Sequence, residues 1–396
     1  MNGKGNGFGR RRFLAAPGAL AMKRKFDIPA ANLREPESIP EFWVSTVEGV
    51  GTFLRSRVKK GALRTIGKTA GGRTIQAVFY GRPREGRGTT TYSGSLGFGN
   101  VAAYRGPDHA RKVYWAMAGV HGGEFEGMIG MVNLLSVIET GADLRGTAWP
   151  EIETAARALD RLILIPIVNV DGRARIPLRM IRHQGTDETV HEYFNTGAKP
   201  DGSNIGWPQC KEHIPLDFAK TQFPGGYPND AGVNIQHDDF FGARQPETQA
   251  LCDLAARERP DLLLNLHTGA NYLHPLRSFV EPTLIPVFED LYRQLMTKLT
   301  ERGHQMSGDA AREADPKRER PPVYNLDTAL NLHCGGLPLL IESPSHNFSH
   351  AKRNGQPVFH TPGDLLEAQL LCHQEAMKFL AATGGRAEWT RRRAGA

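Results

Sequence analysis

The sequence predicts a single α/β domain in which a mixed, largely parallel sheet is flanked by helices on both faces. Short apolar runs recur along the chain, as expected for strands that are buried on both sides. Segments with helical periodicity alternate with these runs, and this alternation is typical of a parallel sheet covered by helices. Hydrophobic residues make up 40% of the 396 residues and charged residues 23%, which is too apolar for intrinsic disorder.

Five apolar runs predict the strands. In chain order they are Thr74–Tyr80, Val113–Ala118, Leu162–Val168, Leu262–Leu266 and Leu337–Ile341. Helices are predicted between and after these runs, at Glu124–Glu139, Pro246–Glu258, Pro286–Glu301 and Asp364–Ala381. The polar stretch from Arg173 to Gly232 shows little periodicity, but its aromatic residues argue against plain disorder. We expect it to be an ordered loop region that lies over one end of the sheet.

Basic residues concentrate at the two ends of the chain. The net charge is +7, but residues 1–25 contain seven basic residues and no acid, and residues 386–396 carry an excess of three. These two segments leave residues 26–385 with a net charge of −3, which argues against nucleic-acid binding. We therefore predict a basic leader or tail at residues 1–35, a folded domain at 36–385 and a basic tail at 386–396. No apolar stretch approaches the roughly 20 residues of a membrane-spanning helix.

The N-terminal segment leaves two localisations open. Residues 10–14 read RRRFL and resemble the core of a twin-arginine export signal, and Ala19–Ala21 resembles a cleavage site. The alternative is a loose basic extension on a protein that stays in the cytoplasm. The four cysteines are widely spaced and form no CxxC pair, so neither a zinc knuckle nor a disulfide-rich scaffold is indicated.

Three predicted strands end in residues that can bind or assist a metal ion. The strand at 113–118 leads into His121 and Glu124, the strand at 262–266 leads into His267, and the strand at 337–341 leads into Glu342. In open α/β sheets, ligands bind beyond the carboxyl ends of the strands. Two imidazoles and one carboxylate are the protein ligands of a catalytic zinc ion, which keeps one position open for water. We therefore predict one Zn²⁺ at His121, Glu124 and His267.

Several segments resemble, in order, the landmarks of the M14-type zinc carboxypeptidases. These are IGKTAGGRTI at 66–75, HGGE at 121–124, NVDG at 169–172, GVNIQH at 232–237 followed by PET at 246–248, then His267 and Glu342. The resemblance covers about residues 60–380. It implies a zinc carboxypeptidase-like fold for the domain at 36–385, and a metallopeptidase that cleaves a peptide or peptide-like amide.

The resemblance also implies catalytic roles. Glu342 corresponds to the general base, which takes a proton from the metal-activated water and delivers it to the leaving amine. An arginine usually stabilises the developing oxyanion in this family. Arg182 is the best candidate by its distance from the NVDG turn, and Arg179 is the second. Tyr324 is the counterpart of a tyrosine that closes over the substrate.

One segment departs from the family pattern. The pair that binds the substrate's terminal carboxylate in this family is Asn-Arg, and the matching positions here are Gln236 and His237. A histidine lacks the permanent charge and the bidentate geometry of an arginine. We therefore expect metal-dependent amide hydrolysis with altered end recognition, in which Gln236, His237 and the nearby Arg244 contact the substrate.

Two other functions stay open at this point. One is a zinc-dependent amidase or deacylase of N-acyl amino acids, which would use the same zinc ion and glutamate with a differently shaped pocket. The other is a zinc-binding or peptide-binding module without catalysis. Glu342 counts against the second, because a pure binding module does not need a general base. The sequence does not predict an oligomeric state.

Overall fold

The computed structural model describes most of the chain. The described residues are 26–182, 188–211, 214–270, 274–276, 279–304, 324–344, 352–353, 356–357 and 360–394. The strands are β1 (Ala62–Lys68), β2 (Thr74–Gly81), β3 (Val113–Ala118), β4 (Arg161–Ile165), β5 (Leu262–Ala270), β6 (His274–Leu276), β7 (Leu337–Pro344), β8 (Lys352–Arg353) and β9 (Gln356–Pro357). The α-helices are α1 (Val47–Arg57), α2 (Tyr92–Gly97), α3 (Val101–Arg105), α4 (Phe125–Thr140), α5 (Pro150–Arg157), α6 (Val170–Arg175), α7 (Glu188–Asn195), α8 (Pro246–Glu258), α9 (Ile285–Glu301), α11 (Leu326–Cys334), α12 (Pro362–Thr383) and α13 (Arg386–Ala394).

Seven of the described strands form one sheet in the order β1-β2-β4-β3-β5-β7-β6. The four central strands β4, β3, β5 and β7 are parallel to one another. The strands toward both edges pair antiparallel with their neighbours. This arrangement confirms the mixed, largely parallel sheet that the sequence predicts.

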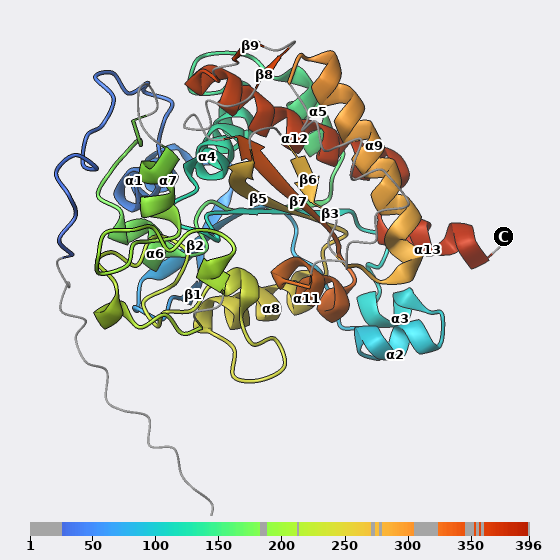
Figure 1. Ribbon diagram of the computed structural model, residues 1–396. Coiled ribbons are helices and arrows are strands. Elements are labelled where there is room, and N and C mark those ends of the chain that lie inside the picture. The colour runs from blue at the N-terminus through green and yellow to red at the C-terminus, as the bar shows by residue number, and fades with distance from the viewer. Residues whose placement is uncertain are drawn as a thin grey trace, which may run out of the picture.

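Helices cover both faces of this sheet (Figure 1). On one face α12 packs against α4, α5 and α9, and α4 also contacts β3 and β5. On the other face α11 packs against α8 and β7. Every residue of β3 and β4 is buried, which explains why these strands read as continuous apolar runs in the sequence.

The predicted elements are present, with shifted ends in some cases. The strand at 113–118 and the helix at 246–258 have the predicted bounds. β4 ends at Ile165, three residues earlier than predicted, where Pro166 has no backbone N–H to donate to a neighbouring strand. β5 and β7 instead continue beyond the predicted ends to Ala270 and Pro344, so that His267 and Glu342 lie within strands.

The C-terminal segment that the sequence sets apart as a basic tail begins with a packed helix, α13. The backbone N–H of Arg386 donates to Asp261, and its guanidinium donates to Glu281 at 3.0 Å. Trp389 is buried and lies against Phe379. The structure therefore extends the domain past residue 385.

Residues 1–25 lie outside the described part of the chain, so the twin-arginine signal stays a prediction. Among the helices that the structure describes, none has the length and apolar character that crossing a membrane requires.

Candidate metal centre

A turn between β3 and α4 positions the first two predicted ligands. His121 lies three residues after the end of β3, and Glu124 occupies the position just before the first residue of α4. Gly122 sits in this turn because the backbone of Arg173 passes close by: a Cβ atom at position 122 would lie 2.1 Å from the Arg173 nitrogen. His267 lies in β5, whose Leu266 pairs with Ala118 of β3. The parallel pairing of β3 and β5 thus brings the third ligand to the same end of the sheet.

The three side chains converge on one point and are buried. Nδ1 of His121 lies 2.8 Å from Oε1 of Glu124, and Nδ1 of His267 lies 3.0 Å from Oε2 of the same carboxylate. The two Nδ1 atoms are 3.2 Å apart. All three candidate ligand atoms lie within 4.8 Å of one another, so one metal ion can be reached by all of them.

Asn234 determines which nitrogen of His121 faces this point. The Asn234 Oδ1 atom accepts a hydrogen bond from the backbone N–H of Gln236 at 3.0 Å, which identifies it as the oxygen of the amide. The same oxygen lies 3.1 Å from Nε2 of His121. An oxygen acceptor requires a proton on Nε2, so Nδ1 of the neutral ring carries a lone pair.

The lone pair on His121 explains why the group fits a cation. Burial lowers the pKa of His121, so the ring is neutral and its Nδ1 lone pair faces the Glu124 carboxylate at 2.8 Å. Two electron-rich atoms this close repel each other unless a proton or a metal ion lies between them. The donor set therefore fits a divalent metal ion with nitrogen and oxygen ligands, as zinc is.

Glu124 is held in the ionised form that a metal ligand needs. Burial raises the pKa of Glu124, but the neighbouring His121 and His267 outweigh burial and hold this pKa well below its usual range. Asn195 donates to one carboxylate oxygen at 3.3 Å, and the backbone N–H of Thr268 donates to the other at 3.1 Å. These two bonds orient the carboxylate toward the histidines.

Glu342 lies beside the metal group. In the parallel pairing of β5 and β7, Glu342 is directly opposite His267. Gly269 leaves space above the carboxylate, because a Cβ atom at position 269 would lie 3.3 Å from Oε2 of Glu342. Burial raises the pKa of Glu342, and the negative charge of Glu124 adds to this effect while His267 opposes it. Among the described residues, none forms a hydrogen bond or an ion pair with this carboxylate.

The polar stretch 173–232 covers this end of the sheet, as predicted, and supplies contacts that the sequence analysis missed. The ring of Tyr227 stacks on His121, with centroids 3.7 Å apart and planes at 7°. Asn195 comes from the end of α7 in the same stretch. In the sequence, Tyr227 stands out only as an aromatic residue in a loop rich in glycine and proline. Its position in the sequence does not indicate a contact with His121.

The two residues at the Asn-Arg position are placed differently from each other. Gln236 donates from its side-chain amide to Asp327 of α11 at 2.7 Å, and Asn265 of β5 donates to the Gln236 carbonyl oxygen at 3.3 Å. Gln236 is thus tied to buried polar groups of the core. Burial lowers the pKa of His237 to about 3, with the nearby charge of Lys211 as the next cause, so His237 is neutral near pH 7.

Arg244 and Tyr324 both contact the segment that contains Phe240 and Phe241. Arg244 donates from Nε and Nη2 to the backbone oxygen of Phe240. Tyr324 is 41% exposed and stacks on the exposed ring of Phe241, with centroids 5.8 Å apart. No contact between described residues joins either side chain to the metal group, so their roles stay predictions.

The two candidates for the oxyanion arginine are both exposed. Arg179 forms an ion pair with Glu35 at 2.9 Å, which occupies its guanidinium. Arg182 forms no ion pair with any residue that the structure describes, and the chain beyond it, at 183–187, lies outside the described residues. The role of Arg182 therefore stays a prediction.

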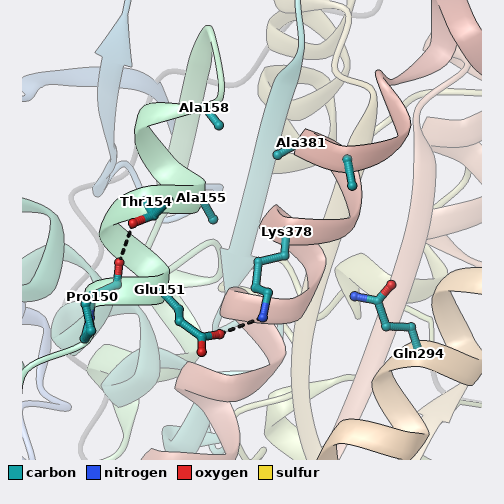
Figure 2. A pocket seen from close by; sticks show the side chains of 9 residues that line it. Pro150, Glu151, Thr154, Ala155, Ala158, Gln294, Lys378 and Ala381 are labelled. Carbon is teal, nitrogen blue, oxygen red and sulfur yellow. Dashed lines mark hydrogen bonds and ion pairs between the residues drawn. The ribbon is translucent and has the colours of Figure 1, made fainter.

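A groove of about 640 Å³ lies elsewhere on the molecule, between α5, α9 and α12. Figure 2 shows its lining, in which Lys378 of α12 pairs with Glu151 of α5 at 2.6 Å. Four of its nine lining residues are alanines, and none is a candidate metal ligand.

A comparison with protein families decides the identity of this fold and site. The model of the zinc carboxypeptidase family, Peptidase_M14, matches residues 59–306. The chain belongs to the zinc carboxypeptidase family. The match includes all three candidate ligands and ends before Glu342, which the parallel pairing of β5 and β7 places beside them. Zinc is the cofactor of this family, and the His-Glu-His group fits it.

Solved structures of metallocarboxypeptidases share this fold. A metallo-carboxypeptidase from Burkholderia cenocepacia is 15% identical, with a TM-score of 0.50 over 85% of this chain and 69% of that chain. A metallo-carboxypeptidase from Pseudomonas aeruginosa is 16% identical, with a TM-score of 0.50 over 84% of this chain and 69% of that chain. A comparison with curated proteins gave no match. The family and the fold together identify a metallopeptidase.

Proposed function

We propose that this zinc carboxypeptidase family member hydrolyses an amide bond of a peptide or peptide-like substrate, with zinc held by His121, Glu124 and His267 and with Glu342 as the general base. When bound, zinc polarises a carbonyl oxygen and makes water a stronger nucleophile at neutral pH. Asn234 would orient His121, and Asn195 and Thr268 would orient Glu124, through the hydrogen bonds described above.

The position and surroundings of Glu342 carry this proposal. Its carboxylate lies opposite His267, has a raised pKa and forms no hydrogen bond or ion pair with a described residue. A structural acid at this place would be expected to form an ion pair. A general base instead needs a free carboxylate that takes a proton from the attacking water and delivers it to the leaving amine.

A second candidate function, a deacylase of N-acyl amino acids, is not separated from the first by His237, because the substrate of either can carry a free carboxylate next to the scissile amide. Because His237 is neutral near pH 7, it presents no permanent charge to a C-terminal carboxylate. A deacylase of N-acyl amino acids would use the same residues on a different substrate. The two functions differ in whether the scissile amide joins two amino acids or an acyl group and an amine.

The test is a hydrolysis panel of peptides with free, amidated and acylated ends, measured with and without a chelator. Glu342→Gln removes the proton acceptor but keeps the size of the side chain, and we expect kcat to fall about 10²–10⁴-fold. Zinc content, measured by metal analysis, should stay near that of the wild type.

The matched control is Glu151→Gln, which removes an acid in the groove of Figure 2. This variant should retain wild-type kcat. Activity that survives both the chelator and Glu342→Gln would rule out the proposed function.

A further inference from the structure

Lys211 lies at the edge of the candidate active site. It ends a short 3₁₀ helix, Gln209–Lys211, within the polar stretch that covers the metal group. The preceding residue, Cys210, is buried and packs with Tyr227 in a small apolar cluster. Cys210 and Tyr227 also line a small cavity together with Asn234. Since Tyr227 stacks on His121 and Asn234 bonds to it, the helix that carries Lys211 rests on the residues that hold the first ligand.

The ammonium group of Lys211 is not neutralised by the described part of the chain. Its Nζ atom lies over the ring of Trp207, 4.7 Å from the centroid, and no described acid forms an ion pair with it. Trp207 is 60% exposed, so the lysine and the ring form an accessible edge of the site. A cation above an aromatic face keeps its charge available to a further ligand.

The positive charge of Lys211 acts on a side chain of the candidate active site. Burial lowers the pKa of His237, and Lys211 is the strongest charged group that adds to this effect. His237 ends the short helix that Asn234 caps, and Asn234 bonds to His121, so the charge of Lys211 acts on the segment that holds the first ligand.

Two of the other cations that sequence reasoning places near the substrate, Arg179 and Arg244, are engaged elsewhere. Arg179 pairs with Glu35, and Arg244 donates two N–H groups to the backbone oxygen of Phe240. His237 is neutral near pH 7.

The metal ligands and Glu342 do not need Lys211 to offset their charges. A divalent zinc ion offsets the two carboxylates of Glu124 and Glu342, and its histidine ligands are neutral. The ammonium of Lys211 adds a positive charge at the edge of the site, and it attracts an anion.

We propose that Lys211 is a specificity-determining residue that binds a carboxylate of the substrate next to the scissile amide. This inference rests on the proposed amide hydrolysis and names the class of its substrate. An ammonium group is a point charge without the fixed fork of a guanidinium, so it accepts a carboxylate in several orientations. The carboxylate can therefore belong to the leaving amino acid or to the acyl group, as in an N-succinyl amide.

The test uses two variants of the full-length zinc enzyme. Lys211→Met keeps an unbranched apolar side chain over Trp207 and removes the charge, whereas Lys211→Arg keeps the charge. The matched control is Lys220→Met, which removes an exposed lysine of the same polar stretch that pairs with Asp217 at 3.8 Å. Circular dichroism and zinc content should match the wild type in all three variants.

Two substrate pairs separate the two sources of the carboxylate. One pair is an N-acetyl dipeptide with a free C-terminus and its C-terminal amide. The other is an N-succinyl and an N-acetyl amino acid amide. We expect Lys211→Met to lower kcat/KM about ten- to hundredfold for the carboxylate member of at least one pair. The neutral members should change less than twofold, and Lys211→Arg should stay within a few-fold of the wild type.

Binding of reaction products distinguishes a failure of this inference from a failure of the proposed function. Titration calorimetry would compare L-phenylalanine with L-phenylalaninamide, and succinate with succinamide, on the wild type and on Lys211→Met. Weaker binding of a carboxylate form alone in Lys211→Met supports the inference even if no tested amide is hydrolysed. Equal effects on charged and neutral members of each pair, or no effect on either, would overturn it.

Discussion

Asn234 shows how a residue that does not bind the metal can decide what the metal group binds. Its side-chain oxygen requires a proton on Nε2 of His121 and so leaves the lone pair of Nδ1 pointing at the other ligands. In the opposite tautomer, the proton on Nδ1 would occupy the place of the metal ion. The choice of tautomer therefore precedes metal binding and depends on one amide.

We predict that Asn234→Leu weakens zinc binding about 10–100-fold, because it removes the acceptor that fixes the tautomer of His121. Asn234→Asp keeps an oxygen at this place and should retain most of the affinity. Competition against a chromogenic chelator measures both values. Asn100→Leu, a change at the exposed start of α3, serves as the control and should leave the affinity unchanged. Equal zinc affinity in Asn234→Leu and the wild type would contradict the role of this side chain.

The ligands and Glu342 could be predicted from the sequence, whereas the residues around them could not. His121, His267 and Glu342 follow apolar runs that read plainly as strands, and parallel strands bring their carboxyl ends together. Tyr227 comes from a loop without periodicity, so only the folded chain shows that it meets His121. Gln236 stays a predicted substrate contact, and the structure also ties it to Asp327, a contact between distant segments that no local pattern reveals.

At the scale of elements, the long β5 and β7 strands explain both the success and the limits of sequence reasoning. Their central apolar runs were evident, but their ends carry His267 and Glu342, which are polar residues that a hydrophobic pattern does not extend into. β1 was missed for a related reason. It lies at an edge of the sheet and none of its residues is buried, so its sequence lacks a continuous apolar run.

The start of α8 is tied to two other segments by Glu247. The carboxylate accepts a hydrogen bond from the backbone N–H of Ala70, in the turn between β1 and β2, and another from the side chain of Asn229. Burial raises the pKa of Glu247 to about 7, above its ordinary value of 4.5. The folded protein therefore favours the protonated form of a side chain that is completely buried.

This pKa predicts a dependence of stability on pH. The stabilising effect of protonated Glu247 is fully present below about pH 4.5, and it is lost as the pH rises through about 7. Between these limits the wild type should lose up to about 3 kcal/mol of unfolding free energy through this group. Glu247→Gln cannot ionise, so its stability relative to the wild type should improve by this amount from pH 4.5 to pH 8. Urea unfolding at several pH values measures the difference.

The control for this experiment is Glu301→Gln at the exposed end of α9. Its stability curve should run parallel to that of the wild type across the same pH range. A parallel curve for Glu247→Gln as well would show that the buried carboxyl group does not ionise in this range.

At the scale of the whole molecule, the metal centre joins parts of the chain that are far apart in sequence. Glu124 and His267 are separated by more than 140 residues, and they meet only because β3 and β5 pair in the middle of the sheet. An unfolded chain does not present this set of ligands. Zinc binding should therefore stabilise the folded state as a whole.

Removal of zinc with a chelator should lower the thermal midpoint by several degrees. Free zinc at 100 times its dissociation constant would contribute about 2.7 kcal/mol to the stability of the folded protein. Differential scanning fluorimetry, with metal analysis of the same samples, measures the shift. His267→Gln removes a ligand, so its midpoint should not respond to the chelator. An unchanged midpoint in wild-type protein that has lost its zinc would contradict this link.

The order of the strands in the sheet also predicts the order in which the enzyme should lose activity and zinc on heating. The metal ligands lie in β5 and in the turn after β3, two strands at the centre of the sheet. Glu342 lies in β7, whose outer neighbour is the short edge strand β6. Edge strands open more readily than central ones. Opening at β6 would disturb the surroundings of Glu342 while the ligands stay paired. Partially heated enzyme should thus pass through a metal-loaded but inactive form before it releases zinc.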